Sequence, residues 1–394
     1  MARNFTDEYI RRQFYIVGLS YGEANQFIST LDSTNATVTA TLYAAFPKIT
    51  ETRSLSIGQR NQIDTLANRI TRIRGRAVAD YRFTFEKALA ELVGTETAFD
   101  GRQFESLPET DGDDVLVPPA SVIAPAIIAL GIFDGRTIDE WFNGFVVGDA
   151  ARIRQSLAAS INNGLSTDQA IKSLLGSKNL GYKDGALNTS RASARTLART
   201  VWNGVSNLAH RAFNRANSGL IAYEEYTAIL DGKTTFICAS LDGNKYEVGL
   251  GPYPPLHRNC RSHRYPVPNL LVHPESVTDR PFVRDTRTDK ELQKDFRADA
   301  KRRVGGDRWS RLSSREINAE IRVEKDRWVK ANVGTVPSTV TWTEWFSRQP
   351  AQFKRDYLGS TRYKAYLNGT KISGFVAPTG RPWTIEQLKK RGIV

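Results

Sequence analysis

Both cysteines of this 394-residue chain, and three of its four histidines, lie in one stretch from Cys238 to His273. The stretch contains Cys238-Ala-Ser-Leu-Asp-Gly-Asn and, further on, Gly251-Pro-Tyr-Pro-Pro-Leu-His-Arg-Asn-Cys-Arg-Ser-His263. Thiols and imidazoles are otherwise almost absent from the chain. Their gathering in one short segment therefore indicates that the fold must pin this segment at a fixed turn.

Four of these side chains form a candidate metal site. Two thiolates and two imidazoles can be supplied by Cys238, His257, Cys260 and His263. Structural zinc accepts such a ligand set in tetrahedral geometry. Their spacing matches no common zinc finger. Three interpretations stay open: one structural zinc, a turn held by hydrogen bonds, or a disulfide. No other cofactor is expected.

The residues around the turn predict a small antiparallel sheet. Strands are expected at Ala222–Leu230, at 235–239 and at 245–248, because these runs lie between turn-forming residues. Asp242-Gly243 is typical of a hairpin turn between the second and third strands. The run from Pro252 to Pro255 cannot pair in a central strand, so it is expected to cross the surface and present the turn.

Most of the remaining chain predicts helices. A long helix is expected from about Ser56 to Leu92, and another carries an apolar stripe from Ala194 to Phe213. A hydroxyl residue followed three positions later by Glu or Gln marks a helix start. Such starts are predicted at Ser20, Thr137, Ser166, Ser313, Thr341 and Thr384.

The predicted fold class is therefore α+β and mostly α-helical. We expect a helical N-terminal region over 1–104, followed by an acidic linker over 105–119 that is rich in helix-breaking residues. A central helical domain with the small sheet follows over 120–280. A basic, mainly helical C-terminal extension is expected over 281–394.

The net charge of +13 is concentrated in that extension. Residues 281–394 hold 25 Lys and Arg against 13 Asp and Glu, a net charge of +12. A surface of one sign attracts polyanions, so this region predicts either nucleic-acid contact or an acidic protein partner. The candidate phosphate-binding residues are Lys301, Arg302, Arg303, Arg308, Arg311 and Arg315.

Composition excludes several other classes. Two cysteines provide no disulfide framework. The N-terminus lacks the apolar core of a signal peptide, and the most apolar run, from Val122 to Phe133, is too short to span a bilayer. We expect a soluble protein without membrane contact that stays in the compartment where it is made.

The motif Pro254-Pro-Leu-His-Arg-Asn-Cys-Arg261, which follows Leu241-Asp-Gly243, resembles the signature of the Mu F-like phage head morphogenesis proteins. Gly135-Arg-Thr-Ile-Asp-Glu-Trp141 and the helical run from Ala194 to Asn207 are similar to upstream segments of that family. The resemblance covers about residues 120–280. Many relatives have a second Cys where this chain has Ser262, so His263 would have to replace that ligand.

The resemblance implies a minor capsid protein of a tailed phage. Such a protein is assembled in the host cytoplasm and resides in the virion head near the portal. Its partners would be the portal protein, other head proteins and DNA that it helps to package. The DNA would be bound by non-specific phosphate contact.

The sequence does not predict an enzyme. His257, Asn259 and His263 are spaced too tightly for a His-Asn-His nuclease, and no phosphate-binding loop of the Walker type is present. Cys238 and His257 could also form a nucleophilic pair if they meet in space. Two alternatives stay open: a metal-dependent nucleic-acid-processing enzyme that uses the Cys/His turn, or a purely structural capsid-binding protein.

Overall fold

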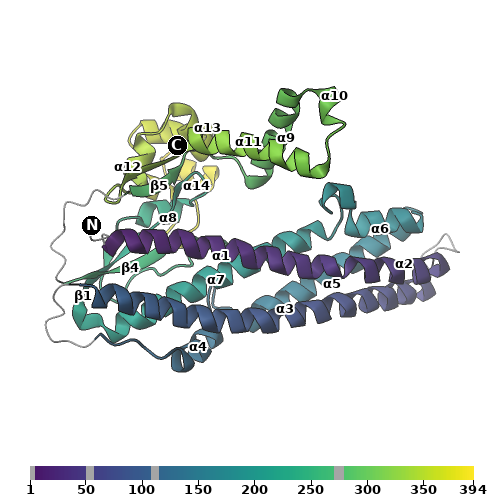
Figure 1. Ribbon diagram of the computed structural model, residues 1–394, viewed down its shortest axis with the longest axis horizontal. Helices are drawn as coiled ribbons and strands as arrows, with labels where there is room; N and C mark the ends of the chain where they lie inside the picture. The colour runs from purple at the N-terminus through teal and green to yellow at the C-terminus, as the bar shows by residue number, and fades with distance from the viewer. Residues whose placement is uncertain (1–4, 50–56, 108–114, 270–278) are drawn as a thin grey trace. The chain divides into compact units, whose positions relative to one another are not determined.

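The computed structural model describes residues 5–49, 57–107, 115–269 and 279–394, which are mostly helical with two three-stranded sheets (Figure 1). The predicted α+β, mostly α-helical class is therefore confirmed. The chain divides into two compact units. The helical unit comprises Phe14–Ser218 and Tyr253–Cys260, and the sheet unit comprises Met1–Gln13, Gly219–Pro252 and Arg261–Val394.

The helical unit is built on one very long helix. Its helices, with α1 entering at residue 14, are α1 (Phe5–Ser33), α2 (Asn35–Ile49), α3 (Ile57–Glu105), α4 (Ala120–Ala129), α5 (Ile138–Asn162), α6 (Thr167–Leu175), η1 (Lys178–Leu180) and α7 (Asn188–Ala216). Helices α4, α5 and α7 all pack along α3 (Figure 1). Because apolar residues such as Leu66, Phe85 and Leu89 recur at helical spacing, α3 buries one continuous stripe against its neighbours.

The long helices agree with the sequence pattern, but their ends differ. Helix α3 starts at Ile57, close to the expected position, and continues past Leu92 to Glu105. It thus reaches the predicted linker over 105–119, of which residues 108–114 lie outside the described part of the chain. In α7, Ala194, Leu197, Val201, Val205 and Phe213 are buried as predicted.

Five of the six predicted helix starts are confirmed. In each case the hydroxyl residue caps a helix, and the Glu or Gln three residues later completes the capping box. These caps are Thr137, Ser166, Ser313, Thr341 and Thr384. The start at Ser20 is wrong, because α1 runs through this position and the Ser20 hydroxyl donates to the Val17 carbonyl at 2.7 Å. A serine can make this bond inside a helix, so the local pattern misleads there.

The sheet unit contains two small sheets. Its elements are η2 (Ser218–Leu220), which joins it to α7, then β1 (Ile221–Thr227), β2 (Leu230–Asp231), α8 (Phe236–Leu241), β3 (Lys245–Tyr246), β4 (His263–Pro268), β5 (Asp279–Val283), α9 (Asp289–Val304), α10 (Gly306–Trp309), α11 (Ser314–Asn332), β6 (Val333–Pro337), α12 (Trp342–Ser347), α13 (Ala351–Leu367), η3 (Ile372–Phe375) and α14 (Ile385–Lys390). One sheet has the antiparallel order β3-β1-β4. The other has the order β2-β5-β6, with β2 and β5 parallel.

The predicted strand at 235–239 is wrong. Thr235 is the N-cap of helix α8, and the other four residues belong to that helix. It buries the adjacent Cys238 and Ala239, and adjacent burial does not fit the alternation of a half-buried strand. Ala239 belongs to a core cluster that also includes Trp342 and Phe375. Tertiary packing therefore overrides the local β preference. Asp242-Gly243 links α8 to β3, so the predicted hairpin between 235–239 and 245–248 is also wrong.

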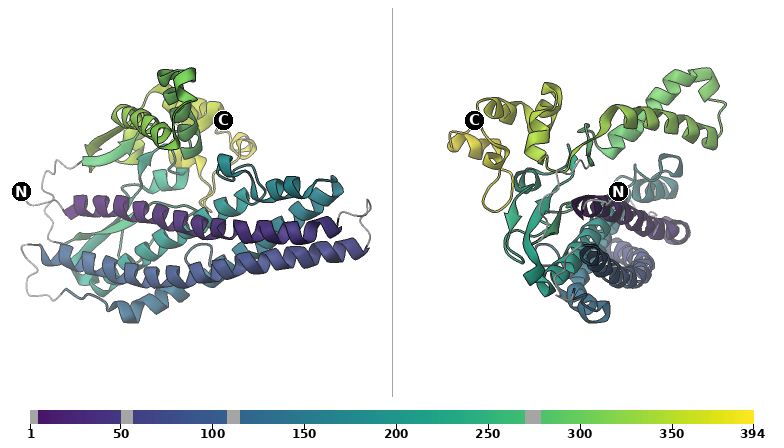
Figure 2. Two further views of the ribbon diagram at one scale, coloured as in Figure 1. Left: turned by 45° about the vertical axis from the view of Figure 1, so that its right-hand side comes forward. Right: turned by 60° about the vertical axis from the view of Figure 1, so that its left-hand side comes forward.

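The residues after β5 form two groups within the sheet unit. Helices α9, α10 and α11 pack on one another, and we call Asp289–Asn332 the basic arm. The right-hand view of Figure 2 shows this arm in green, apart from the yellow-green helices α12 to α14. The second group closes around a cluster of aromatic side chains, in which Trp342 stacks on Phe346 at 4.7 Å between ring centroids.

In the described part of the chain, no helix has both the length and the apolar character needed to cross a membrane.

Candidate functional site

The proline-rich turn, Tyr253–Cys260, is fastened to one face of α7. Asn259 donates its backbone N–H to the Thr200 hydroxyl at 2.9 Å and its side-chain amide to the Thr196 hydroxyl at 3.3 Å. Asn203 donates its side-chain amide to the carbonyl of Cys260 at 3.0 Å. Thr196, Thr200 and Asn203 lie at helical spacing, so they present their polar groups on the same side of α7. The hydrogen-bonded turn, one of the three interpretations of the motif, is therefore present.

Asn259 also has a special backbone conformation. Its φ of +58° lies in the left-handed region, where Asn is tolerated better than most residues with a side chain. The same residue therefore turns the chain and supplies two of the bonds to α7. This double role explains why the motif needs Asn, and not a glycine, at this position.

Close packing holds the start of the turn. A Cβ placed on Gly204 of α7 would lie 2.1 Å from Ile132 Cγ2 and 3.3 Å from Pro255 Cγ. The helix can accept Pro255 and Ile132 at this point only because residue 204 has no side chain. Arg211, also on α7, places its guanidinium 5.0 Å from the ring centroid of Tyr253.

Buried ion pairs hold the chain on both sides of the turn, within the sheet unit. Arg264 donates to Glu224 at 2.7 Å, and both side chains are fully buried. The same guanidinium donates to the carbonyl of Leu250 at 2.6 Å, and the Gly249 N–H donates to Glu224 at 3.0 Å. This pair thus orders the loop that leads into the turn.

After the turn, Arg261 forms two hydrogen bonds with Asp231, at 2.6 and 2.8 Å. Burial raises the pKa of Asp231, but the Arg261 charge outweighs this effect and the net shift is downward. Gln13 donates to the carbonyl of Arg261 at 2.7 Å. The arginine of the Asn-Cys-Arg motif therefore has a structural role, in that it fixes the exit of the turn to β2.

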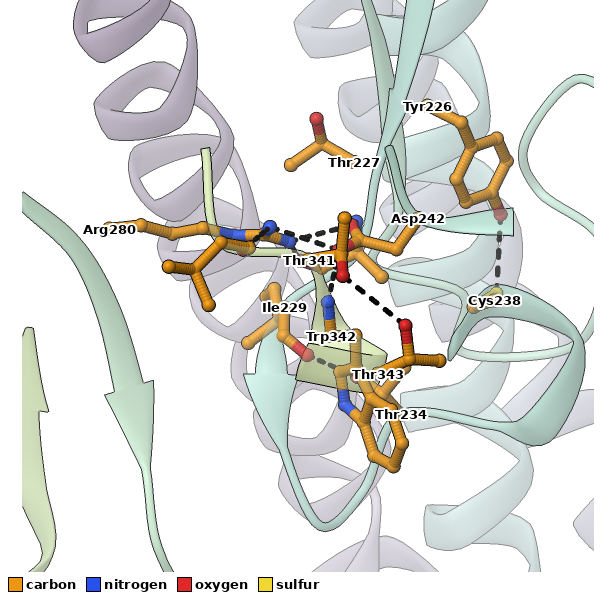
Figure 3. A network of polar contacts seen from close by, with 12 residues as sticks. Tyr226, Thr227, Ile229, Thr234, Cys238, Asp242, Arg280, Thr341, Trp342 and Thr343 are labelled. Atoms are coloured by element: carbon orange, nitrogen blue, oxygen red, sulfur yellow. Dashed lines mark hydrogen bonds and ion pairs between the residues drawn. The ribbon is translucent and has the colours of Figure 1, made fainter. Parts of the chain in front are cut away.

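The two thiols lie in different local settings. Cys238 is buried in α8, where its sulfur accepts a hydrogen bond from the Tyr226 hydroxyl at 3.2 Å (Figure 3). Cys260 is buried at the end of the turn. No disulfide joins the two residues, so the structure does not contain the disulfide that one interpretation proposed.

The four predicted metal ligands divide between the two units. His257 and Cys260 lie on the proline-rich turn of the helical unit, whereas Cys238 and His263 belong to the sheet unit. His257 Nδ1 is 2.9 Å from the Arg258 carbonyl, and a proton on that nitrogen would leave Nε2 as the metal-binding atom. His263 begins β4, and its ring stacks on Tyr9 at 6.3 Å between ring centroids.

The structure places all six predicted phosphate-binding residues on the basic arm. Lys301, Arg302 and Arg303 lie in the last turn of α9, Arg308 lies in α10, Arg311 follows α10, and Arg315 lies in α11. Arg303 forms ion pairs with Glu320 at 2.7 Å and Glu324 at 2.5 Å, which join α9 to α11. Arg302 pairs with Asp299 and remains largely exposed. Among the described residues, no ion pair involves Lys301, Arg308, Arg311 or Arg315, and all four are exposed.

Sequence reasoning missed the polar face of α7. Thr196, Thr200 and Asn203 lie beside the apolar stripe, and two of them are buried. The signal available in the sequence was that these three polar residues recur at helical spacing beside a stripe predicted to be core. Such a pattern indicates a buried hydrogen-bonded contact.

Comparison with known proteins supports the resemblance over the segment that contains this site. No curated protein and no solved structure matches the chain. Residues 151–264, which include α7, α8 and the proline-rich turn, match the family model described as Phage Mu protein F like protein, and the resemblance to that family is thereby confirmed over this segment.

Proposed function

We propose that this chain is a minor component of a phage head that contacts DNA through the basic arm and docks near the portal. The match to the Mu F-like family supports a role in head morphogenesis. The DNA contact rests on one observation, the group of exposed cations on α9, α10 and α11.

The chemistry of this group suits phosphate. Four exposed cations lie between the last turn of α9 and the first turn of α11, namely Lys301, Arg308, Arg311 and Arg315. Several cations close together release condensed counterions as they neutralise phosphates, which gives affinity without sequence readout. Arg303 has a different role, because its two ion pairs hold the arm together.

The test is duplex binding by the full-length chain over a range of salt concentrations. The arm should not be tested as an isolated 281–394 fragment, because the core of this region includes Leu230 and Ala239. We expect affinity to fall steeply with salt and to be the same for unrelated sequences. The slope of log K against log salt is negative, where K is the association constant for DNA. Replacing Arg308, Arg311 and Arg315 with Gln should reduce the magnitude of that slope by roughly 2 to 3.

A matched control separates this surface from overall charge. Arg60, Arg69 and Arg76 are exposed on α3, and replacing them with Gln removes the same charge. The control should bind DNA nearly as well as the wild type. Equal losses in both triple variants would show that net charge alone attracts DNA, and absence of duplex binding at low salt would contradict the DNA contact.

Docking near the portal is the second part of the proposal. The first 280 residues carry almost no net charge, since nearly all of the +13 comes from residues 281–394. Such a surface suits contact with protein more than with DNA. The portal should co-purify with the full-length chain and with the triple variant of the arm alike. If the triple variant lost both DNA binding and portal binding, the two partners would not bind separate surfaces of the chain.

We also propose that the Cys/His turn binds one zinc ion through His257 and Cys260. A thiolate and an imidazole are ligands that suit zinc, and Cys260 is buried. The sequence offers Cys238 and His263 as the further ligands.

A further inference from the structure

A pocket with a volume of about 410 Å³ lies within the helical unit. Its walls come from α5, from the first turns of α7 between Thr189 and Leu197, and from Arg258 and Asn259 of the proline-rich turn. This volume is in the range of small-molecule binding sites. The pocket is separate from the basic arm, and no residue of the proposed zinc site lines it.

Three arginines line this pocket, and no Asp or Glu does. Arg152 donates to the hydroxyls of Ser190 at 3.2 Å and Ser193 at 3.4 Å, both of which are neutral partners. Arg136 is bonded to Asp134, outside the lining, at 2.8 Å. Arg258 is exposed, and its charge helps Arg136 to lower the pKa of Asp134. Asp134 balances Arg136, but no carboxylate of the lining pairs with Arg152 or Arg258, so the pocket keeps a net positive charge.

The aromatic ring of Trp141 brings two of these arginines together. The guanidinium of Arg136 lies 4.1 Å from the ring centroid of Trp141, and that of Arg258 lies 5.6 Å from it. Two cations drawn to one ring form a site that a bound anion stabilises, because the anion screens their mutual repulsion.

Uncharged donors complete the lining. Thr196 and the side-chain amide of Asn259 belong to the pocket, whereas the Ser193 hydroxyl already donates to the Thr189 carbonyl at 3.0 Å. Trp141 is 6% exposed, and in the described part of the protein its indole Nε1 has no hydrogen-bond partner. A buried donor that lacks a partner is uncommon in a native fold and calls for an acceptor that the chain itself does not provide.

We propose that this pocket binds a phosphate group, carried by a nucleotide or present as free phosphate. The three arginines and the neutral donors offer more N–H and O–H groups than the two oxygens of a carboxylate can accept, whereas a phosphate presents three or four oxygens. The volume leaves room for an organic group attached to the phosphate. Because Arg258 and Asn259 belong to the proline-rich turn, ligand binding would bear directly on the conformation of that turn.

The test measures binding of inorganic phosphate and of deoxyadenosine monophosphate to the full-length chain, by calorimetry and by the shift in melting temperature. Both probes should bind if the pocket recognises phosphate alone. A nucleotide that binds at least about tenfold more tightly than phosphate would identify the nucleotide as the better ligand. If neither probe binds at millimolar concentration, the proposal is wrong.

Gly144 offers a variant that fills the pocket without removing a donor. Gly144 is a lining residue on α5, and a Cβ placed there meets no atom within 4 Å. Gly144→Glu should place a carboxylate among the arginines and abolish binding of both probes. Gly144→Gln has nearly the same size without the charge, so it should retain more affinity than Gly144→Glu. Equal binding by Gly144→Glu and the wild type would overturn the assignment.

A charge-removal pair gives an independent check. Arg152→Gln should weaken phosphate binding by about tenfold, because it removes a charged donor. Arg154→Gln is the control, since Arg154 lies on the same helix, pairs with Asp64 and does not line the pocket. The triple variant of the basic arm should bind the small probes normally, which keeps this result distinct from that of DNA binding. Equal losses in Arg152→Gln and Arg154→Gln would count against the pocket.

Discussion

Asp242 and Arg280 form a buried ion pair that connects four segments of the sheet unit (Figure 3). The Asp242 carboxylate accepts two bonds from Arg280, at 2.9 and 2.6 Å, and one each from the backbone N–H groups of Trp342 at 2.6 Å and Ala228 at 2.5 Å. Arg280 in turn donates to the carbonyls of Val340 and Ala228. The Asp of the Leu-Asp-Gly motif thus organises contacts with residues a hundred positions away.

Replacing Asp242 with Asn should destabilise the sheet unit strongly. The change would leave the buried Arg280 without its counter-charge, and breaking a buried pair in this way costs about 3 to 5 kcal/mol. Asp299→Asn is the control, because its pair with Arg302 is exposed and such pairs contribute about 1 kcal/mol or less. The measurement is chemical denaturation of both variants. Similar losses in the two variants would contradict the assigned role of Asp242.

Gly204→Ala should destabilise the helical unit by about 1 to 3 kcal/mol, because the new methyl group would collide with Ile132 where α7 also receives Pro255. Gly75→Ala in α3 is the matched control. Its Cβ would meet no atom within 4 Å, and the exchange should stabilise that helix by up to about 1 kcal/mol. Thermal denaturation distinguishes the two. A stabilised Gly204→Ala variant would show that the turn does not pack tightly against α7.

The pH dependence of stability should report on His210. Its ring lies between Asp100, 2.7 Å from Nδ1, and Glu96, 3.0 Å from Nε2, and all three side chains are fully buried. Burial lowers the pKa of His210, but the charges and hydrogen bonds of Asp100 and Glu96 outweigh this effect and raise the pKa to about 10.

This pKa lies above the value of about 6.5 expected in the unfolded chain. The charged ring therefore contributes its full stabilisation below about pH 6.5, and this contribution is lost as the pH rises through about 10. The difference in unfolding free energy between wild type and His210→Gln should shrink over that range. A difference that stays constant from pH 6.5 to pH 10 would contradict the charged state of His210.

Metal analysis tests the proposed zinc site. Native mass spectrometry should find about one zinc per chain, and both thiols should react with a thiol reagent only after a chelator removes the metal. Cys260→Ser should lose the metal, because it removes a thiolate of the proposed site. If the protein contains no metal and both thiols react without a chelator, the turn is held by its hydrogen bonds to α7 and not by zinc.

Local chemistry explains which parts of the fold the sequence predicted. The capping boxes at Thr137 and Ser313 depend on four consecutive residues, so they are visible in the sequence. The sheet of β2, β5 and β6 depends on pairing between residues far apart in the chain, such as Leu230 with Phe282. Nothing near Leu230 signals that partner. Helix α8 was missed for a similar reason, because its burial depends on the distant aromatic cluster around Trp342.

The candidate site shows the same division. The motif identified the turn and the candidate metal ligands, since rare side chains stand out in a sequence. The attachment of the turn to Thr200 and Asn203 requires the three-dimensional course of the chain. The convergence of Arg136, Arg152 and Arg258 on one pocket required it too, because these residues come from three separate segments. The domain boundaries at 105–119 and 280–281 remain predictions.

The basic arm is the surface proposed to contact DNA. The most direct measurement is to cross-link the full-length wild-type chain to duplex DNA at low salt and to identify the modified peptides by mass spectrometry. If the basic arm contacts DNA, the modified peptides should come mainly from residues 301–315, where the exposed cations lie. Cross-links confined to other segments, such as α3, would contradict this contact.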